Sequence, residues 1–152
     1  MKTLATLATA FAIGGAAAAI AVPTSTAIAE PTAADAAAWV PLVPDLGDKG
    51  PQLQVVFGDL KKKKSPIGLL LKIPAGFTPG PHTHSSSYSG VVIYGELLDA
   101  EPGELASAEK LTAGRRWTER ANHPHDNQCT AKGECLEFVY FPKGFDFKPI
   151  TK

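Results

Sequence analysis

Short apolar runs separated by turn residues occupy the chain from position 39 onward. No window of helical length shows a 3.6-residue apolar repeat, and the turns are rich in Gly and Pro. Regularly spaced short strands with such turns are typical of all-β sandwiches and barrels. We therefore predict strands at Trp39–Val43, Leu53–Phe57, Ile67–Ile73, Tyr88–Tyr94, Glu96–Leu98, Ala106–Leu111, Arg116–Thr118 and Cys135–Phe141.

The segment before these strands has the pattern of an export signal. Lys2 is followed by a long Ala/Leu/Ile-rich run, and Ala27-Ile28-Ala29 fits a signal peptidase site. We predict a signal peptide over 1–29, a flexible lead-in over 30–38 and a single domain over 39–152. The alternative is an uncleaved N-terminal anchor. Cleavage places the protein in a bacterial periplasm or outside the cell.

Composition narrows the range of partners. Lys+Arg and Asp+Glu are equal at 15 each, which favours neither nucleic acid nor a charged membrane surface. The four lysines at 61–64 precede Ser65-Pro66 and are read as a solvated hairpin tip. We expect no nucleic-acid partner, and no membrane partner once the signal peptide is removed.

Two cysteines lie close together in the sequence, at Cys129 and Cys135, with a turn signal at Lys132-Gly133 between them. In an oxidising compartment a close pair of this kind favours a disulfide, here predicted to join facing positions of a hairpin. The alternative is a thiolate ligand at Cys129, four residues after His125.

The four histidines fall into two His-x-His pairs, His82/His84 and His123/His125, each directly after a turn. Residues i and i+2 of a strand point to the same face, so such a pair can aim two imidazoles into one space. Neutral imidazoles bind Zn, Fe, Cu, Ni or Mn ions. The alternative is a set of surface or hydrogen-bonded structural histidines.

The sequence around these pairs resembles the cupin superfamily. Gly76-x5-His82-x-His84-x3-Tyr88-x6-Gly95 is similar to the first cupin motif, and Gly114-x10-His125 matches the Gly and His of the second. In the second motif, Arg120, Asn122 and Cys129 stand where the family has Pro, Gly and Asn. The chain also looks like small exported single-domain cupins and like the cupin-type domain of zinc-binding anti-sigma factors.

This resemblance implies an antiparallel jelly-roll β-barrel that holds a divalent transition metal through His82, His84 and His125. His123 is a further candidate, although the turn at 121–124 need not direct it to the same point. Tyr88 stands at the position of the motif glutamate, which leaves a neutral three-histidine site and favours Zn²⁺, Cu²⁺ or Ni²⁺ over Mn²⁺. Tyr88 is predicted either to place its phenol beside the metal, with a catalytic role, or to pack as an ordinary strand aromatic.

Four carboxylates were compared as substitutes for that glutamate. Glu96 lies too far along its strand from the histidines, and Asp126 should face away from His125. Glu119 is a candidate from the loop before His125. Glu137 is a candidate buried carboxylate on which we place no prediction of ligation.

These observations lead to a functional hypothesis with alternatives. The protein is predicted to be an exported metal-binding cupin that acts on a small molecule, as a dioxygenase- or isomerase-type enzyme. The alternatives are a cupin that senses or carries a metal or small ligand without turnover, and a purely structural barrel. The largely apolar stretch Leu136–Phe141 suggests burial on both faces and hence a homodimer, although a central strand would look the same.

Overall fold

The computed structural model describes residues 38–150, so the predicted signal peptide (1–29) and nearly all of the predicted lead-in (30–38) lie outside the described residues. Within 38–150, no helix has the length and apolar character needed to cross a bilayer. Residues 38–150 form eleven strands and two 3₁₀ turns. In chain order they are β1 (Val40–Pro41), η2 (Pro44–Lys49), β2 (Gln52–Phe57), β3 (Ile67–Ile73), β4 (His82–Thr83), β5 (Tyr88–Tyr94), β6 (Leu97–Ala100), η3 (Leu105–Ser107), β7 (Lys110–Leu111), β8 (Arg116–Glu119), β9 (Asp126–Cys129), β10 (Cys135–Phe141) and β11 (Lys148–Pro149).

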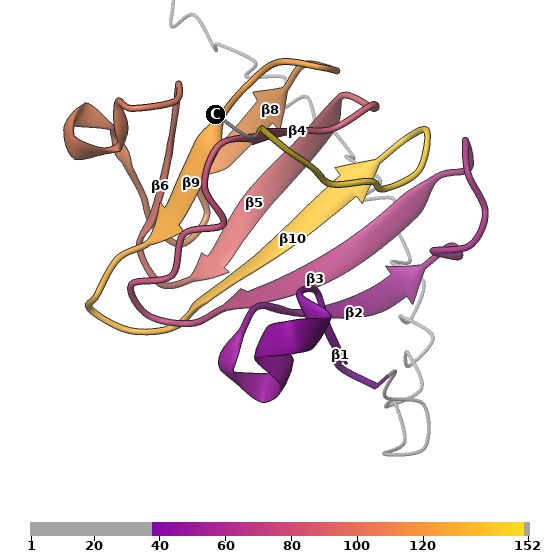
Figure 1. Ribbon diagram of the computed structural model, residues 1–152, viewed down its shortest axis with the longest axis horizontal. Coiled ribbons are helices and arrows are strands. Elements are labelled where there is room, and N and C mark those ends of the chain that lie inside the picture. Colours follow the sequence, from indigo (N-terminus) through magenta and orange to yellow (C-terminus); the bar gives the residue numbers. More distant parts are fainter. Residues whose placement is uncertain (1–37, 151–152) are drawn as a thin grey trace, which may run out of the picture. The chain divides into compact units, whose positions relative to one another are not determined.

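The strands form two main antiparallel sheets and one short pair (Figure 1). The larger sheet has the order β1-β2-β3-β10-β5-β8, and the smaller sheet has the order β7-β6-β9. The short pair β11-β4 joins the end of the described chain to the first histidine pair. Strands β3 and β10 lie at the centre of the larger sheet although they are far apart in sequence, as a jelly roll requires. The predicted all-β fold of antiparallel strands is confirmed.

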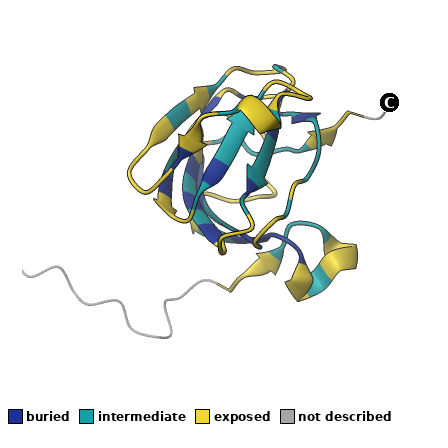
Figure 2. Cartoon of the chain, turned by 90° about the vertical axis from the view of Figure 1, so that its left-hand side faces the viewer, coloured by how far each residue is buried: buried dark blue, intermediate teal, exposed yellow. Residues whose placement is uncertain are grey.

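The core lies between the inner faces of these sheets (Figure 2). Strand β10 alternates along its length, with Cys135, Glu137, Val139 and Phe141 buried and the residues between them partly or largely exposed. One apolar cluster combines residues of both sheets and the other lies around Tyr88 and Phe141. The outer face of β10 is not buried in the single chain, so the predicted burial of both faces is absent here.

A tryptophan fills the space between the two clusters. Trp117 on β8 packs against both, and its ring lies over Gly90 of β5. A Cβ at position 90 would come within 2.3 Å of the Trp117 ring, so only glycine leaves room for it. The second tryptophan, Trp39, is 37% exposed and lies under the ammonium group of Lys72.

Most predicted strands are found, but several boundaries differ. The predicted strand Trp39–Val43 contains only β1, because Pro44 begins a 3₁₀ turn. The predicted strand Ala106–Leu111 overlaps the 3₁₀ turn η3 and retains only the pair in β7. The lysine-rich turn does connect β2 and β3 as an exposed hairpin loop.

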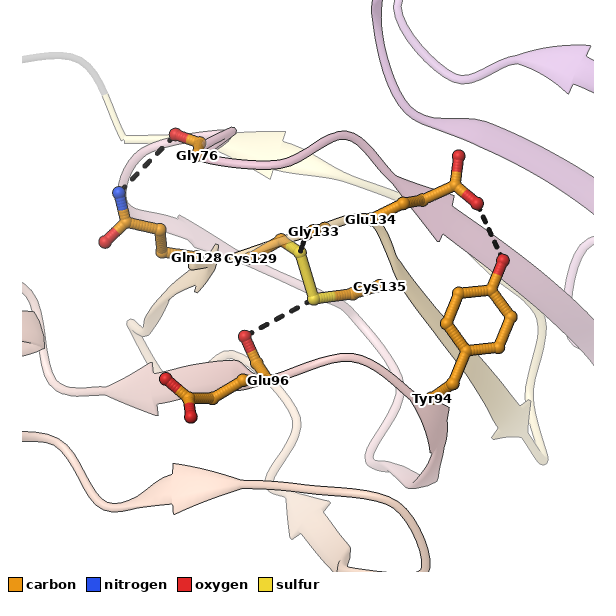
Figure 3. Close-up of a disulfide and its surroundings, with 8 residues drawn as sticks. All are labelled: Gly76, Tyr94, Glu96, Gln128, Cys129, Gly133, Glu134 and Cys135. Carbon is orange, nitrogen blue, oxygen red and sulfur yellow. Dashed lines mark hydrogen bonds between the residues drawn. A yellow bond between two sulfur atoms is a disulfide. The ribbon is translucent and has the colours of Figure 1, made fainter. Parts of the chain in front are cut away.

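The predicted disulfide between Cys129 and Cys135 is present, with an S–S distance of 2.06 Å (Figure 3). Its predicted place in a hairpin is wrong. Cys129 ends β9 in the smaller sheet and Cys135 begins β10 in the larger one, and these strands do not pair with each other. The bond therefore ties the two sheets together. Gly95, at φ +93°, passes so close to Cys135 that a side chain there would collide with its Cα at 2.7 Å.

Candidate metal centre

Two backbone hydrogen bonds hold the two histidine segments side by side. The amide of His82 donates to the carbonyl of His125 at 2.9 Å, and the amide of His125 donates to the carbonyl of His82 at 3.0 Å. This antiparallel bridge brings together residues that are far apart in the sequence. The first pair also gains the strand partner β11. The positions of both histidine segments are therefore set by the sheet rather than by a mobile loop.

Three imidazoles converge at this bridge. The side chains of His82, His84 and His125 are 2%, 5% and 2% exposed. Their rings lie 4.3 to 5.3 Å apart between centroids, and one nitrogen of each lies within 4.8 Å of the others. In the part of the chain described, this is the group of side chains whose arrangement suits a metal ion.

Backbone carbonyls fix which ring nitrogen faces the common point. The Nδ1 atom of His82 lies 2.8 Å from the carbonyl of Gly80, and that of His125 lies 3.0 Å from the carbonyl of His123. The Nδ1 atom of His84 contacts the carbonyl of Asp146. A carbonyl only accepts, so each Nδ1 carries the hydrogen and each Nε2 retains its lone pair. Such carbonyl partners commonly orient the histidines of metal sites.

The environment keeps the first two imidazoles uncharged. Burial lowers the pKa of His82 from 6.5 to about 4, and the neighbouring histidines lower it further while the Gly80 carbonyl opposes the shift. Burial likewise lowers the pKa of His84 to about 4. Both rings are therefore neutral at pH 7, as metal binding requires.

Tyr88 packs as a strand aromatic and also places its phenol beside one of the three imidazoles. Its ring stacks on that of Phe141 with 4.6 Å between the centroids, which is an ordinary packing contact. Its hydroxyl group lies 3.2 Å from Nε2 of His125, so the phenol donates toward the lone pair of that imidazole. Burial raises the pKa of Tyr88 well above its usual range, with Asp99 and Glu137 contributing, so the phenol remains a donor.

His123 does not join the cluster. Its Nε2 atom lies 2.9 Å from Oε1 of Glu101 and its Nδ1 atom lies 3.1 Å from Oε2 of Glu119, and neither nitrogen belongs to the three-imidazole group. Only its backbone carbonyl contributes, through the contact with His125. The structure thus directs one histidine of the second pair inward and the other outward.

The other carboxylates considered from the sequence also lie elsewhere. Glu96 pairs with Lys110 and Lys132, and Glu119 pairs with His123. Asp126 turns away from the cluster and accepts a hydrogen bond from Thr78 at 2.9 Å. The three-histidine group therefore has no carboxylate member.

A pocket opens to solvent beside the cluster. His82, His84 and Tyr88 line one part of it, and the remaining wall is mainly aliphatic and aromatic, including Phe77, Phe141, Phe145 and Phe147. Glu137 also lines it, which sequence analysis did not predict. The strand periodicity was the available signal, because Glu137 shares an inner face with Cys135, Val139 and Phe141.

The donor set fits a divalent transition metal. Three uncharged nitrogen ligands and an adjoining pocket resemble catalytic sites, in which protein ligands leave a position for water or substrate. A disulfide consumes both cysteines, which removes the alternative of a thiolate ligand at Cys129. The ligand types alone fit Zn, Cu, Ni, Fe or Co and do not choose among them.

Comparison with solved structures gives the same fold. An RmlC-like cupin from Ralstonia eutropha JMP134 aligns with a TM-score of 0.58 at 19% identity, over 74% of this chain and 66% of that chain. A structure of the DMSP lyases RdDddP and RnDddQII aligns with a TM-score of 0.60 at 17% identity, over 76% and 63%. The complex of Rhodobacter sphaeroides SigE with the anti-sigma ChrR aligns with a TM-score of 0.52 at 17% identity, over 68% and 47%.

These similarities concern the fold alone, since the identities are low and this chain spans less than two thirds of each matched chain. No curated protein matches the sequence. One family does match, over residues 30–144, and its description is "Domain of unknown function (DUF4437)". The chain therefore belongs to the DUF4437 family, and its fold is that of the cupins.

Proposed function

We propose that the protein binds one divalent transition metal through Nε2 of His82, His84 and His125, and that it is a metal-dependent enzyme acting on a small molecule in the adjoining pocket. The observation that carries this proposal is the convergence of three buried imidazoles whose Nδ1 atoms all face backbone carbonyls. In the metal-free chain Nε2 of His125 accepts from the Tyr88 hydroxyl group, so a bound metal would replace that hydrogen bond.

When bound, the metal would supply Lewis-acid chemistry, or a site for O₂ if it is iron or copper. The chain's own residues then have separate tasks. The phenylalanine-rich wall excludes water from the reacting molecule. With the lone pair of His125 on the metal, the neutral phenol of Tyr88 would donate instead to an oxygen atom of a bound molecule. Isomerase- and dioxygenase-type reactions on oxygen-bearing substrates fit this arrangement.

A second candidate is a metal or small-ligand sensor or carrier without turnover. The missing carboxylate at position 88 favours it, because the site lacks the acidic group of the family motif. The cupin fold also occurs in the ChrR anti-sigma complex, which is regulatory by its description. A structural barrel without metal is the third candidate. One fold supports many functions, so measurement has to choose among them.

Elemental analysis of the native protein and of a His82→Ala/His84→Ala variant tests the site. About one transition metal per chain, lost in the folded variant, is expected. Metal-free protein in both samples, also after incubation with Zn²⁺, Cu²⁺, Ni²⁺ and Fe²⁺, would contradict both the enzyme and the metal-sensor proposals. Turnover of oxygen-bearing small molecules by the loaded protein then separates the enzyme from the sensor.

We also propose that the protein is exported, with 1–29 as signal peptide and 39–152 as one cupin domain. The disulfide supports this proposal, because such bonds persist mainly in oxidising compartments. N-terminal sequencing of protein recovered from the periplasm and the medium is expected to begin at Glu30. A start at Met1 in membrane-bound protein would indicate the anchor instead.

The homodimer remains a prediction. On the outer face of β10, Tyr140 is 38% exposed, and its ring centroid lies 6.1 Å from that of the exposed Phe57. Light scattering on the purified protein measures the oligomeric state directly.

A further inference from the structure

Glu137 is a buried carboxyl group for which the fold provides no apparent use. It lies on the inner face of β10 and is 2% exposed. Its strand neighbours in register are Leu71 on β3 and Val92 on β5, neither of which has a polar side chain. Its Oε2 atom has no hydrogen-bond partner among the described residues. The residue is therefore polar at a position where the barrel would pack an apolar side chain.

Such a position carries a cost in stability. A buried polar atom without a partner loses its hydrogen bonds to water and gains none in the protein. Burial raises the pKa of Glu137 to about 8, so the group is largely a neutral acid at pH 7 and has a hydroxyl hydrogen to donate. A leucine of similar volume would avoid the cost. The presence of an acid here calls for a partner that binds from outside the chain.

That partner would bind in the pocket beside the histidines, because Glu137 lines the same pocket as His82, His84 and Tyr88. Phe141, four residues further along β10, lies at the level of the histidines and contacts both Tyr88 and His84. Four residues of strand span about 13 Å. The wall of the pocket therefore has the histidines and Tyr88 at one level of β10 and Glu137 at another, and most of its other residues are apolar.

We propose that Glu137 is a second anchor in this pocket and binds the far polar end of an elongated, mainly apolar molecule whose near end is an oxygen function held at the three-histidine site. This inference rests on the proposed function, and it narrows the substrate class. An aliphatic or aromatic molecule with a polar group at each end fits the two anchors and the wall between them. A sugar or other polyol does not, because most of its hydroxyl groups would face hydrocarbon.

Other buried polar atoms help to define the assignment. Besides Glu137, four of the described residues have a buried polar side-chain atom without a hydrogen-bond partner: Glu96, Asp99, Trp117 and Thr130. None of these four lines the pocket, whereas Glu137 does. Asp99 serves as a matched control for a buried carboxyl group outside the pocket, with a pKa raised to about 7 mainly by burial. Its charge also helps to raise the pKa of Glu137, so Asp99→Asn keeps the geometry of the pocket and changes only that electrostatic contribution.

The test uses probes that bind metals through one end. Alkyl hydroxamates with chains of two to six carbons are compared with the same compounds bearing a terminal hydroxyl group. Each is titrated into the Co²⁺-loaded protein and followed by its visible spectrum. The wild-type protein and Asp99→Asn are expected to bind the hydroxyl-bearing probe of matching length about 3- to 10-fold more tightly than the plain one.

Two substitutions at Glu137 separate hydrogen bonding from shape. Glu137→Gln keeps a donor and is expected to keep most of the preference. Glu137→Leu is expected to abolish the preference while binding the plain probes as the wild type does. Equal preference in the wild type and Glu137→Leu, or no preference in the wild type at any chain length, would overturn the proposal. Absence of spectral change in every variant would instead show that the metal proposal has failed.

A second measurement needs neither metal nor probe. If Glu137 has no structural partner, metal-free Glu137→Leu is expected to unfold at a higher temperature than the wild type. A clear loss of stability in Glu137→Leu, with Asp99→Asn unchanged, would mean that Glu137 stabilises the barrel itself. That result would overturn the proposal even if the metal site is correct.

Discussion

The two His-x-His segments lie side by side at the same end of the barrel but use their histidines differently. In the first, His82 and His84 both point inward, in and just after the short strand β4. In the second, His125 points inward while His123 turns outward to Glu101 and Glu119. The residue between the second pair is Pro124, and the segment follows a turn in which Asn122 has φ 59°. The shared-face rule holds for the first pair, where the chain is extended, and fails for the second, where it leaves a turn.

The outward histidine still contributes to the site through its backbone. The carbonyl of His123 accepts from Nδ1 of His125, as the carbonyls of Gly80 and Asp146 accept from His82 and His84. The comparison therefore separates a histidine that supplies an imidazole from one that supplies only a carbonyl group. Substitutions in the second segment can test this separation.

The largest effect is expected on metal affinity, when each histidine of the second segment is replaced in turn. His125→Ala removes one of three nitrogen ligands and is expected to weaken metal binding by about 100-fold or more. His123→Ala keeps the carbonyl and is expected to bind metal within about threefold of the wild type. Competition with a chromophoric chelator measures both. Equal losses in the two variants would show that His123 is also a ligand and that the comparison is wrong.

The next effect concerns pH and the first pair. In the metal-free protein the pKa values of His82 and His84 are about 4, against 6.5 in an unfolded chain, so the unfolded state binds protons more readily. Stability is fully present above pH 6.5 and is lost as the pH falls through 4, by at most about 3 kcal/mol per histidine. Urea unfolding at several pH values measures this loss.

Variants make that measurement specific, because other groups also titrate in acid. His82→Gln/His84→Gln is expected to flatten the dependence between pH 6.5 and 4. A slope unchanged in the double variant would mean that the first pair is not held neutral by burial.

A smaller effect is expected at the turn that precedes the second segment. The amide of Asn122 donates to the carbonyl of His84 at 2.7 Å, and its φ of 59° suits Asn or Gly. Asn122→Val should lower the free energy of unfolding by about 1–2 kcal/mol, because a β-branched residue is strained there. Asn122→Gly should change it by less than about 0.5 kcal/mol. Chemical denaturation compares the two.

The smallest effect is expected from the outward partner. Glu119→Gln removes one carboxylate from His123 and should alter stability by less than about 1 kcal/mol, since the pair is partly exposed. Metal affinity should not change. A strong loss of metal in Glu119→Gln would show that the orientation of the His123 ring matters to the site.

The sequence predicted best those strands that are long and contain a clear run of apolar residues. The boundaries predicted for β3, β5 and β10 match the structure, because each has a run of alternating or continuous apolar residues. Strands β4 and β11 have two residues each and are defined by pairing with one another rather than by composition. Pairing partners so far apart in sequence leave no local signal.

The site was predicted in part for the same reason. His82, His84 and His125 could be grouped by spacing and by their resemblance to a motif, and the structure brings them together. The carbonyl of Asp146, which orients His84, could not be predicted, since every residue has a carbonyl and only the fold decides which one lies there. Glu137 was visible as a polar residue on an otherwise apolar strand face, but its lack of a partner appears only in the packed barrel.

The position of Trp117 has an optical consequence. The chain contains two tryptophans, one packed between the core clusters beside Gly90 and one at the surface under Lys72. Iodide in solution should quench the emission of Trp39 and leave that of Trp117. A paramagnetic ion such as Cu²⁺ held by the histidines should do the reverse, because Trp117 packs in the same cluster as Tyr88, whose hydroxyl group contacts His125. The barrel thus has an intrinsic fluorophore that can report when its own site is filled.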